Sequence, residues 1–261
     1  MIVVKFGGHA MKDENGNFAK AISAALATGE KVVVVHGGGP QIDAALKAKH
    51  IESQWIGGFR VTTQEIFDVV EDVLVNQVGH QVAATLSKSG IKAQAISARA
   101  LPTVIAQSRT SLIDGTPADL GFVGDVQSVN PAQLLQLLEQ GIVPVVAPVS
   151  SDVDLKTGLN VNADFAAAAI AASLEASALI VMTDVAGIYR NWPDKSSLIE
   201  SISAEELESI KATFAEGMAP KVQAALDALS FGAKAVRIID GTDPDSFASA
   251  LAGKGGTLVV A

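Results

Sequence analysis

The sequence predicts an α/β fold in which a mainly parallel sheet lies between two layers of helices. Short β-branched runs alternate along the chain with longer segments whose apolar residues recur at helical spacing. The β-branched runs are almost continuously apolar, as expected of parallel strands that helices cover on both faces. No repeat, low-complexity tract or long linker interrupts this alternation, so we expect two lobes on one continuous sheet.

The strand-like runs are short and rich in Val, Ile and Leu. They are Ile2–Phe6 and residues 31–35, 142–147, 179–182, 235–239 and 258–260. Parallel neighbours in a sheet need crossover connections, and the segments between these runs are long enough for helices. We therefore expect right-handed β-α-β crossovers.

The helical segments carry start and stop signals. Asn130 followed by Pro131 is a typical helix start, and Ser203 and Glu206 have the spacing of a capping box. Residues 100–130 contain short β-like pieces among glycines, which predicts a hairpin excursion from the main sheet. The other expected helices cover residues 18–27, 66–86, 131–139, 165–174 and 222–229.

Composition limits the possible functions. The 261 residues include 19 Lys and Arg against 28 Asp and Glu, which gives a formal net charge of −9 and argues against a nucleic-acid partner. Cysteine is absent, so disulfides, thiolate nucleophiles and cysteine-based zinc sites are excluded. No apolar run reaches the ~18 residues of a membrane span, and the N-terminus does not resemble a signal peptide. We expect a soluble, cytoplasmic protein with no membrane partner.

Two glycine-rich segments follow predicted strands. Lys5 and the pair Gly7 and Gly8 come at the end of the first strand, and His36 precedes three consecutive glycines and Pro40 at the end of the second. The carboxyl ends of strands in open α/β sheets are where ligands bind, and amides at a helix N-terminus favour anions. The alternatives are a tight turn with a solvated lysine and a structural, hydrogen-bonded histidine.

Arg60 stands in a short segment with Gly57 and Gly58. An arginine between close-packed backbone segments can hold a carboxylate with two parallel hydrogen bonds. The chain has few arginines, so this one is unusual, although a surface arginine is the simpler explanation. The dinucleotide fingerprint is not present, because Ile42 stands where it needs glycine. A Walker A loop is not present either, because the pair Gly253-Lys254 is followed by Gly255 and has Ala248 upstream.

Polar residues alternate at Asn160, Asn162 and Asp164, directly before a predicted helix. One such residue is enough to cap a helix, so three indicate a site. Lys221 lies in the first turn of another predicted helix, where a cation is locally unfavourable and a bound anion is expected nearby. The four histidines are scattered along the chain, so the sequence predicts no histidine-built metal site.

These motifs occur in an order that resembles the amino-acid kinase family, and within it the N-acetylglutamate kinases. The resemblance covers essentially the whole chain. The motifs are Lys5-Phe6-Gly7-Gly8, His36-Gly37-Gly38-Gly39-Pro40, Gly58-Phe59-Arg60-Val61-Thr62, Gly121-Phe122-Val123-Gly124, Asn160-Val161-Asn162-Ala163-Asp164, Thr183-Asp184-Val185-Ala186-Gly187-Ile188-Tyr189 and Gly217-Met218-Ala219-Pro220-Lys221.

The resemblance implies a three-layer αβα sandwich with a mainly parallel open sheet of about eight strands. It implies an N-terminal lobe, residues 1–165, for the amino-acid substrate and dimerisation, and a C-terminal lobe, residues 166–261, for ATP. The implied reaction is the ATP-dependent phosphorylation of the γ-carboxylate of N-acetyl-L-glutamate to N-acetyl-L-glutamyl 5-phosphate, in arginine biosynthesis. The implied metal is Mg²⁺, held mainly by the nucleotide phosphates and water, with no protein ligand.

The resemblance also implies roles for individual residues. Lys5 and Lys221 would neutralise the transferring phosphoryl group, Asp164 would hold the two lysines, and the amides of Gly8 and Gly38 would cover the phosphoryl oxygens. Substrate binding would involve Gly37, Gly38, Arg60, Asn160 and Asn162, with Arg60 on the α-carboxylate and Asn160 at the acetamido end. Nucleotide binding would involve Lys5, Gly7, Gly8, Thr183, Asp184, Gly187, Tyr189, Met218 and Lys221.

The oligomer is a further expectation from the resemblance. Arginine-inhibited relatives tend to carry an additional N-terminal helix, which is not seen here, so a homodimer that is insensitive to arginine is expected. The segment 66–86 is apolar over more than one face and is the expected dimer element, unless it is simply sandwiched against the sheet.

Two alternatives stay open at this stage. Related kinases act on carrier-linked aminoadipate or glutamate, on carbamate, on aspartate or on UMP with the same loops and lysines. A carrier-linked substrate would need a basic patch, and Arg60 is the one basic residue between positions 52 and 64, which favours a free small acid. A non-catalytic sensor would be expected to have lost Lys5, Lys221 or Asp164, and all three are present.

Overall fold

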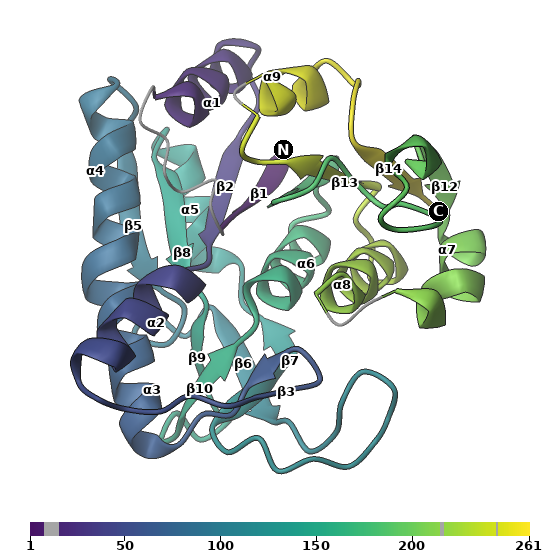
Figure 1. Cartoon of the computed structure of the whole chain (residues 1–261). Coiled ribbons are helices and arrows are strands. Elements are labelled where there is room, and N and C mark those ends of the chain that lie inside the picture. The colour runs from purple at the N-terminus through teal and green to yellow at the C-terminus, as the bar shows by residue number, and fades with distance from the viewer. Residues whose placement is uncertain (8–15, 215–216, 244) are drawn as a thin grey trace.

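The computed structural model describes residues 1–7, 16–214, 217–243 and 245–261. In this part of the chain, eight strands form one twisted central sheet (Figure 1). Their spatial order is β12 (Ser201–Ser203), β14 (Thr257–Val260), β13 (Ala235–Asp240), β11 (Ala178–Thr183), β1 (Ile2–Phe6), β2 (Val32–His36), β8 (Val143–Ala147) and β5 (Ala93–Ser97).

All neighbouring strands of this sheet are parallel except β13 and β14. The six predicted strands are confirmed within one residue at either end. The two strands that were not predicted, β12 and β5, are the edge strands. Each is partly exposed, and neither has the continuous apolar run of a strand that is buried on both faces.

Helices cover both faces of the sheet, which confirms the three-layer αβα fold (Figure 1). Val3 packs with helices on one face, while Ile2 and Val4 pack with helices on the other. The first face carries α5 (Ala132–Glu139), α6 (Ala163–Ser173), α7 (Ala204–Ile210) and α8 (Ala219–Ser230). The second carries α1 (Asn17–Ala27), α2 (Gly39–Ala48), α3 (Gln64–Glu71), α4 (His80–Lys88) and α9 (Ser246–Leu251).

The predicted long helix over residues 66–86 contains an irregularity. Between α3 and α4 the chain forms a π-helix, η2 (Asp72–Gly79), whose turns are wider than those of an α-helix. The apolar side chains of all three segments pack under the sheet, and the outward-facing positions include the exposed Asn76, Gln77 and His80. Packing against the sheet therefore accounts for the apolar residues of this segment.

A second group of strands lies beyond the carboxyl end of β8 (Figure 1). The predicted excursion over residues 100–130 is confirmed as an antiparallel hairpin of β6 and β7. Together with β9 and β10 it closes into a small barrel. The bounds are β6 (Val104–Ser108), β7 (Val123–Val129), β9 (Val149–Ser151) and β10 (Gly158–Val161).

Local signals in the sequence explain several element ends. Ser203 Oγ accepts a hydrogen bond of 3.1 Å from the amide of Glu206 and begins α7, which confirms the predicted cap. A short hairpin of β3 (Trp55–Ile56) and β4 (Phe59–Arg60) turns at Gly57 and Gly58, whose φ values of 54° and 82° favour glycine. Two 3₁₀ turns, η3 (Lys195–Ser197) and η4 (Lys211–Thr213), complete the described elements. No helix in the described residues is long and apolar enough to span a bilayer.

Candidate active site

The first two strands end side by side, and the glycines that follow them lie in contact. The amide of Gly37 donates a 2.8 Å hydrogen bond to the carbonyl of Phe6, which extends the pairing of β1 and β2 past the strand ends. A Cβ atom on Gly7 would lie 3.1 Å from Lys5 Nζ and 3.5 Å from the Gly37 nitrogen, so a side chain here would crowd the lysine ammonium group. Gly8, which was predicted to act beside Gly7, lies outside the described residues.

The glycines after β2 begin helix α2, as predicted. Because the Gly37 amide is already bonded to Phe6, it is not a donor for a ligand. Within the described residues, the amides of Gly38 and Gly39 have no acceptor, and Pro40 occupies the first turn without an N–H group. Among the described residues, these two amides at the N-terminus of α2 are therefore left without an acceptor, and the helix dipole there favours an anion.

A buried cluster of three charges lies beside these amides. Asp164 Oδ1 is 3.1 Å from Lys5 Nζ, and Asp164 Oδ2 is 3.0 Å from Lys221 Nζ. Lys5 comes from β1, Asp164 from the first turn of α6 and Lys221 from the first turn of α8. The structure thus brings together three residues that are far apart in the sequence, as predicted.

The environment of the cluster sets its protonation. Burial by itself raises the pKa of Asp164, but the ion pairs with Lys221 and Lys5 lower it to about 2. Burial lowers the pKa of Lys5, an effect that Asp164 opposes, and Asp164 raises the pKa of Lys221. With both lysines protonated, the cluster carries a net charge of +1 in a water-poor site and attracts an anion.

The polar residues before α6 have separate tasks. Asn162 Oδ1 accepts a 2.7 Å hydrogen bond from the amide of Asp164 and caps the helix. Asn160 Nδ2 donates to Thr62 Oγ1 at 3.2 Å, which ties β10 to the segment after β4. The cap thus accounts for Asn162, whereas the carboxylate of Asp164 is left to hold the two lysines.

Arg60 is 5% exposed and is held from three sides. Its Nη1 donates to Ser53 Oγ at 2.6 Å, its Nη2 lies 2.8 Å from Asp43 Oδ1, and its guanidinium lies 4.5 Å from the ring centroid of Trp55. Arg60 is therefore not a surface arginine. Asp43, Ser53 and Trp55 were not predicted. The sequence signal that could have indicated these contacts of Arg60 was a tryptophan, Trp55, close to the pair Gly57 and Gly58.

A cavity of about 530 Å³ joins these groups, and we call it the strand-end cavity. It lies between the carboxyl ends of β1 and β2, the small barrel and the first turns of α6 and α8. Of the residues predicted for the site, those that line it are Lys5, Gly37, Gly38, Arg60, Asn160, Asn162, Asp164 and Lys221. Its volume suits a small ligand with several polar contacts.

Apart from Lys5 and Lys221, the described residues that were predicted to bind a nucleotide lie outside the lining of this cavity. Thr183 ends β11, the strand next to β1, and the turn after it contains Asp184. A Cβ on Gly187 would lie 2.5 Å from Thr257 Oγ1, so Gly187 is needed for packing against β14. Of the other predicted positions, Gly7 lies next to Lys5. The ring of Tyr189 contacts the ring of Trp192, and Met218 occupies the N-cap position of α8.

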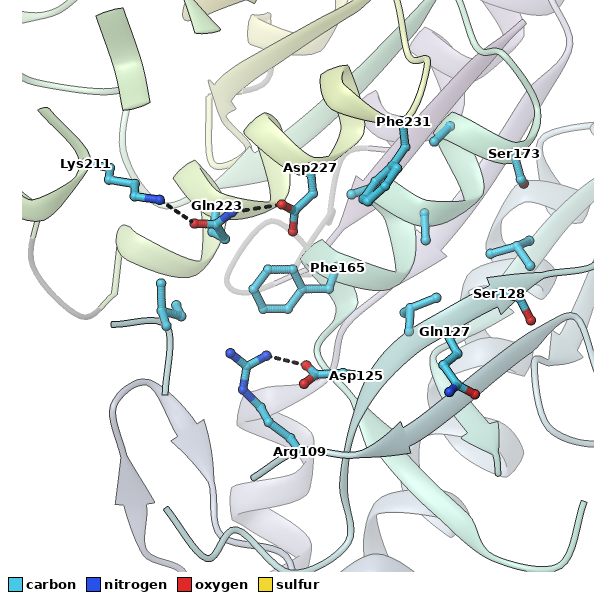
Figure 2. Close-up of a pocket in the computed structure, with 16 residues that line it drawn as sticks. Arg109, Asp125, Gln127, Ser128, Phe165, Ser173, Lys211, Gln223, Asp227 and Phe231 are labelled. Carbon is cyan, nitrogen blue, oxygen red and sulfur yellow. Dashed lines mark hydrogen bonds and ion pairs between the residues drawn. The ribbon is translucent and has the colours of Figure 1, made fainter. Parts of the chain in front are cut away.

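A larger cavity of about 690 Å³ lies on another side of α6 and α8, and we call it the Phe165 cavity (Figure 2). Figure 2 shows Arg109 and Asp125 on one side of Phe165 and Gln223 and Asp227 on the other. None of the residues predicted for the site lines this cavity. The larger cavity is therefore not the candidate active site.

No metal site is formed by the protein side chains that the structure describes. Within the described ranges, no three His, Asp or Glu side chains gather closely enough to hold a metal ion. Both oxygens of Asp164 face lysine ammonium groups, so this carboxylate does not have the free oxygens that a Mg²⁺ ligand needs.

Comparisons with known proteins agree with this geometry. Residues 1–240 match the model of the amino acid kinase family. The acetylglutamate kinase of Nocardia farcinica is 44% identical over 246 residues, which cover 94% of this chain and 81% of that protein. The acetylglutamate kinase of Kineococcus radiotolerans is 41% identical over 254 residues, which cover 94% and 85%.

A solved structure shows the same fold. The protein smu.665 from Streptococcus mutans UA159 is 28% identical and superposes with a TM-score of 0.82, over 99% of this chain and 98% of that one. The sequence match, the shared fold and the buried cluster of Lys5, Asp164 and Lys221 point to one family. The chain belongs to the amino acid kinase family.

Proposed function

We propose that the protein is an acetylglutamate kinase. It transfers the γ-phosphoryl group of ATP to the γ-carboxylate of N-acetyl-L-glutamate, in arginine biosynthesis. A carboxylate oxygen forms a bond to the phosphorus, the bond to the β–γ bridging oxygen of ATP breaks, and the products are N-acetyl-L-glutamyl 5-phosphate and ADP. The observation that carries the proposal is the cluster of Lys5, Asp164 and Lys221 beside the free amides of α2. The names of the relatives support the choice of substrate.

The chemistry fits a site without a general base. A carboxylate nucleophile is already ionised at pH 7, so no proton has to be removed before attack. Catalysis then depends on aligning two anions and on neutralising the charge of the transferring group. Lys5 and Lys221 approach that group from β1 and α8, and Asp164 keeps the two ammonium groups about 3 Å from its own oxygens.

The amino-acid substrate occupies the strand-end cavity in this proposal. Arg60 binds the α-carboxylate, which takes the place of the Asp43 carboxylate that now lies 2.8 Å from Nη2. Asn160 and Asn162 both line the cavity and bind the substrate, with Asn160 at the acetamido end, and the amide of Gly38 covers the phosphoryl oxygens. Gly37 contributes to the wall of the cavity and to the position of Gly38, since its own amide is bonded to Phe6.

ATP approaches from the C-terminal lobe. Its binding would involve Thr183, Asp184, Gly187, Tyr189 and Met218 together with Lys5, Lys221, Gly7 and Gly8. Thr183 lies at the same edge of the sheet as Lys5, because β11 and β1 are parallel neighbours. Mg²⁺ bound to the phosphates would supply further charge neutralisation at the nucleotide, without a ligand from the protein.

The lobes and the oligomer belong to the same proposal. Residues 1–165 would bind the amino acid and form the dimer, and residues 166–261 would bind ATP. The homodimer would use the outward face of the segment formed by α3, η2 and α4, where Asn76, Gln77 and His80 are exposed. We also propose that the enzyme works in the cytoplasm.

The test is a panel of possible phosphoryl acceptors. ADP release is measured with ATP, Mg²⁺ and, in separate reactions, N-acetylglutamate, glutamate, aspartate, UMP and carbamate. We expect turnover with N-acetylglutamate to exceed turnover with each of the others, and trapping with hydroxylamine to give the acyl hydroxamate. No turnover with N-acetylglutamate, or faster turnover with another acceptor, contradicts the proposal.

A further inference from the structure

His36 is a buried histidine to which the proposed reaction gives no task. It ends β2, is 0% exposed, and does not line the strand-end cavity. Directly after it come Gly37 and Gly38, and the amide of Gly38, which has no acceptor among the described residues, is one of the groups that the proposed reaction needs. His36 thus lies two residues before a proposed catalytic donor.

The ring of His36 bonds the backbone that carries this donor. Nδ1 lies 2.9 Å from the carbonyl oxygen of Gly37. A carbonyl oxygen only accepts hydrogen bonds, so Nδ1 carries the proton in this contact. Burial lowers the pKa of His36 to about 4, so the ring is neutral at pH 7 with its single proton on Nδ1.

Holding the carbonyl of Gly37 also sets the direction of the next N–H group. The peptide between Gly37 and Gly38 is trans, and in a planar trans peptide the N–H points opposite to the C=O. Because the carbonyl points toward the buried ring, the N–H of Gly38 points away from it. Gly38 lines the strand-end cavity and His36 does not, which agrees with an N–H directed toward that cavity.

The π-helix η2 packs against both the ring of His36 and the backbone of Gly38. A Cβ on Gly79 would lie 3.1 Å from His36 Nε2, so the ring packs closely on residue 79 and would have to shift if a side chain stood there. In the described residues His36 Nε2 has no hydrogen-bond partner. A Cβ on Gly38 would lie 2.5 Å from a methyl group of Leu74, which belongs to the same π-helix. The wide turns of η2 thus pack against both groups.

We propose that His36 is a positioning residue for phosphoryl transfer. Its Nδ1–H holds the carbonyl of Gly37 and so keeps the amide of Gly38 aimed at the transferring phosphoryl group. The inference rests on the proposed function, in which the amide of Gly38 covers the phosphoryl oxygens. His36 touches neither substrate, and it acts through the peptide between Gly37 and Gly38.

The test compares three replacements of His36 in the full-length enzyme. In His36→Asn the side-chain amide nitrogen stands near the position of Nδ1, in His36→Gln it stands near Nε2, and His36→Leu has no donor. Loss of one preorganised donor lowers kcat by ~10²–10³-fold, and a donor that is present but points in the wrong direction should lower kcat by a smaller factor. We expect kcat to fall about 10-fold or more in the Gln and Leu variants and about 3-fold or less in the Asn variant. The KM values for both substrates should change little.

A second variant separates positioning from stability. In Gly79→Ala the new Cβ would lie 3.1 Å from Nε2 and 3.2 Å from the carbonyl oxygen of Leu74, so the ring has to shift by a few tenths of an ångström. Gly79 has helical backbone angles, with φ −57°, where alanine is favoured over glycine by up to ~1 kcal/mol. Because this gain opposes the cost of the two close contacts, we expect a Tm close to that of the wild type together with a lower kcat, a combination that general destabilisation does not produce.

The proposal is overturned if the Gln and Leu variants keep the kcat of the wild type. It is also overturned if the Asn variant loses as much kcat as they do, or if the loss appears in KM instead. These outcomes are distinct from a failure of the proposed function, because every variant is compared with a wild-type enzyme that turns over N-acetylglutamate. A wild type without that turnover contradicts the proposed function itself.

Discussion

Two cavities flank the helices α6 and α8, and they differ in how their charges are compensated. In the strand-end cavity, Lys5 and Lys221 share the single carboxylate of Asp164, and free amides of α2 lie beside them. In the Phe165 cavity, the guanidinium of Arg109 pairs with Asp125 (Figure 2). The larger cavity is thus charge-balanced, whereas the smaller one has an excess of buried positive groups.

The two cavities also hold two carboxylates with opposite pKa shifts. The lysines lower the pKa of Asp164 to about 2, against an opposing effect of burial. Burial raises the pKa of Asp227, which accepts a 2.8 Å hydrogen bond from Gln223 Nε2. An excess of buried charge, rather than the volume of a cavity, therefore marks the site that should bind an anion. The following predictions test this difference, from the largest expected effect to the smallest.

The largest effect is expected for Asp164→Asn. This change leaves two buried ammonium groups without their carboxylate, and breaking a buried ion pair in this way costs ~3–5 kcal/mol of the free energy of unfolding. Chemical denaturation at pH 7 measures the loss. Because the folded-state pKa of Asp164 lies below its ordinary value of 3.8, its contribution to stability is present above pH 4 and disappears as the pH falls toward 2. The difference between wild type and variant should shrink over that range, and a constant difference would contradict the assignment.

The next effect is expected for the two lysines. Lys5→Ala and Lys221→Ala should each lower kcat for ADP release by at least ~10²-fold, because each removes a preorganised positive charge from the transferring group. Lys211→Ala, in the Phe165 cavity, is the matched control and should leave kcat unchanged. Equal losses in all three variants would mean that the two cavities do not differ in function.

A smaller effect is expected for Arg60→Ala. Hydrogen bonds to a charged group contribute ~1.5–3 kcal/mol, so KM for N-acetylglutamate should rise about 10-fold or more while kcat at saturation is largely kept. Arg60→Lys keeps the charge without the planar fork and should be intermediate. Loss of kcat at saturating substrate would show that Arg60 acts in the chemical step instead.

The smallest effect is expected for Asp227→Asn. The kcat and both KM values should stay within about 2-fold of the wild type, because Asp227 lies outside the strand-end cavity. The folded-state pKa of Asp227 is raised, so its contribution to stability is present below pH 4 and is lost as the pH rises through the folded-state pKa. The variant should therefore gain stability relative to the wild type on going from acid to neutral pH, opposite to Asp164→Asn. A large loss of activity would show that the Phe165 cavity takes part in the reaction.

The parts of the fold that sequence reasoning missed are those with a mixed or weak pattern. β5 and β12 lie at the sheet edges, where a strand does not need a continuous apolar run. The helical spacing over residues 66–86 was read correctly, but the π-turns of η2 were not predicted, since the apolar pattern did not distinguish them from α-helix. In the site, Asp43 and Ser53 could not be predicted, because nothing in the sequence distinguishes them from other polar residues of helices and loops. Their role follows only from their contacts with Arg60 in the folded chain.

The sequence by itself determined the alternation of buried strands and helices, and hence a three-layer sandwich with its ligand site at the carboxyl ends of the strands. It also indicated which residues could bind anions. Glycines after a strand leave backbone amides accessible to a ligand, and a lysine in the first turn of a helix is unfavourable unless an anion lies nearby. Only the tertiary structure decided that Asp43 and Ser53 hold Arg60, that the Gly37 amide is already bonded, and that His36 holds the peptide before Gly38. Local patterns follow from backbone and burial preferences, whereas the pairing of charges and the direction of an amide depend on contacts between segments far apart in the chain.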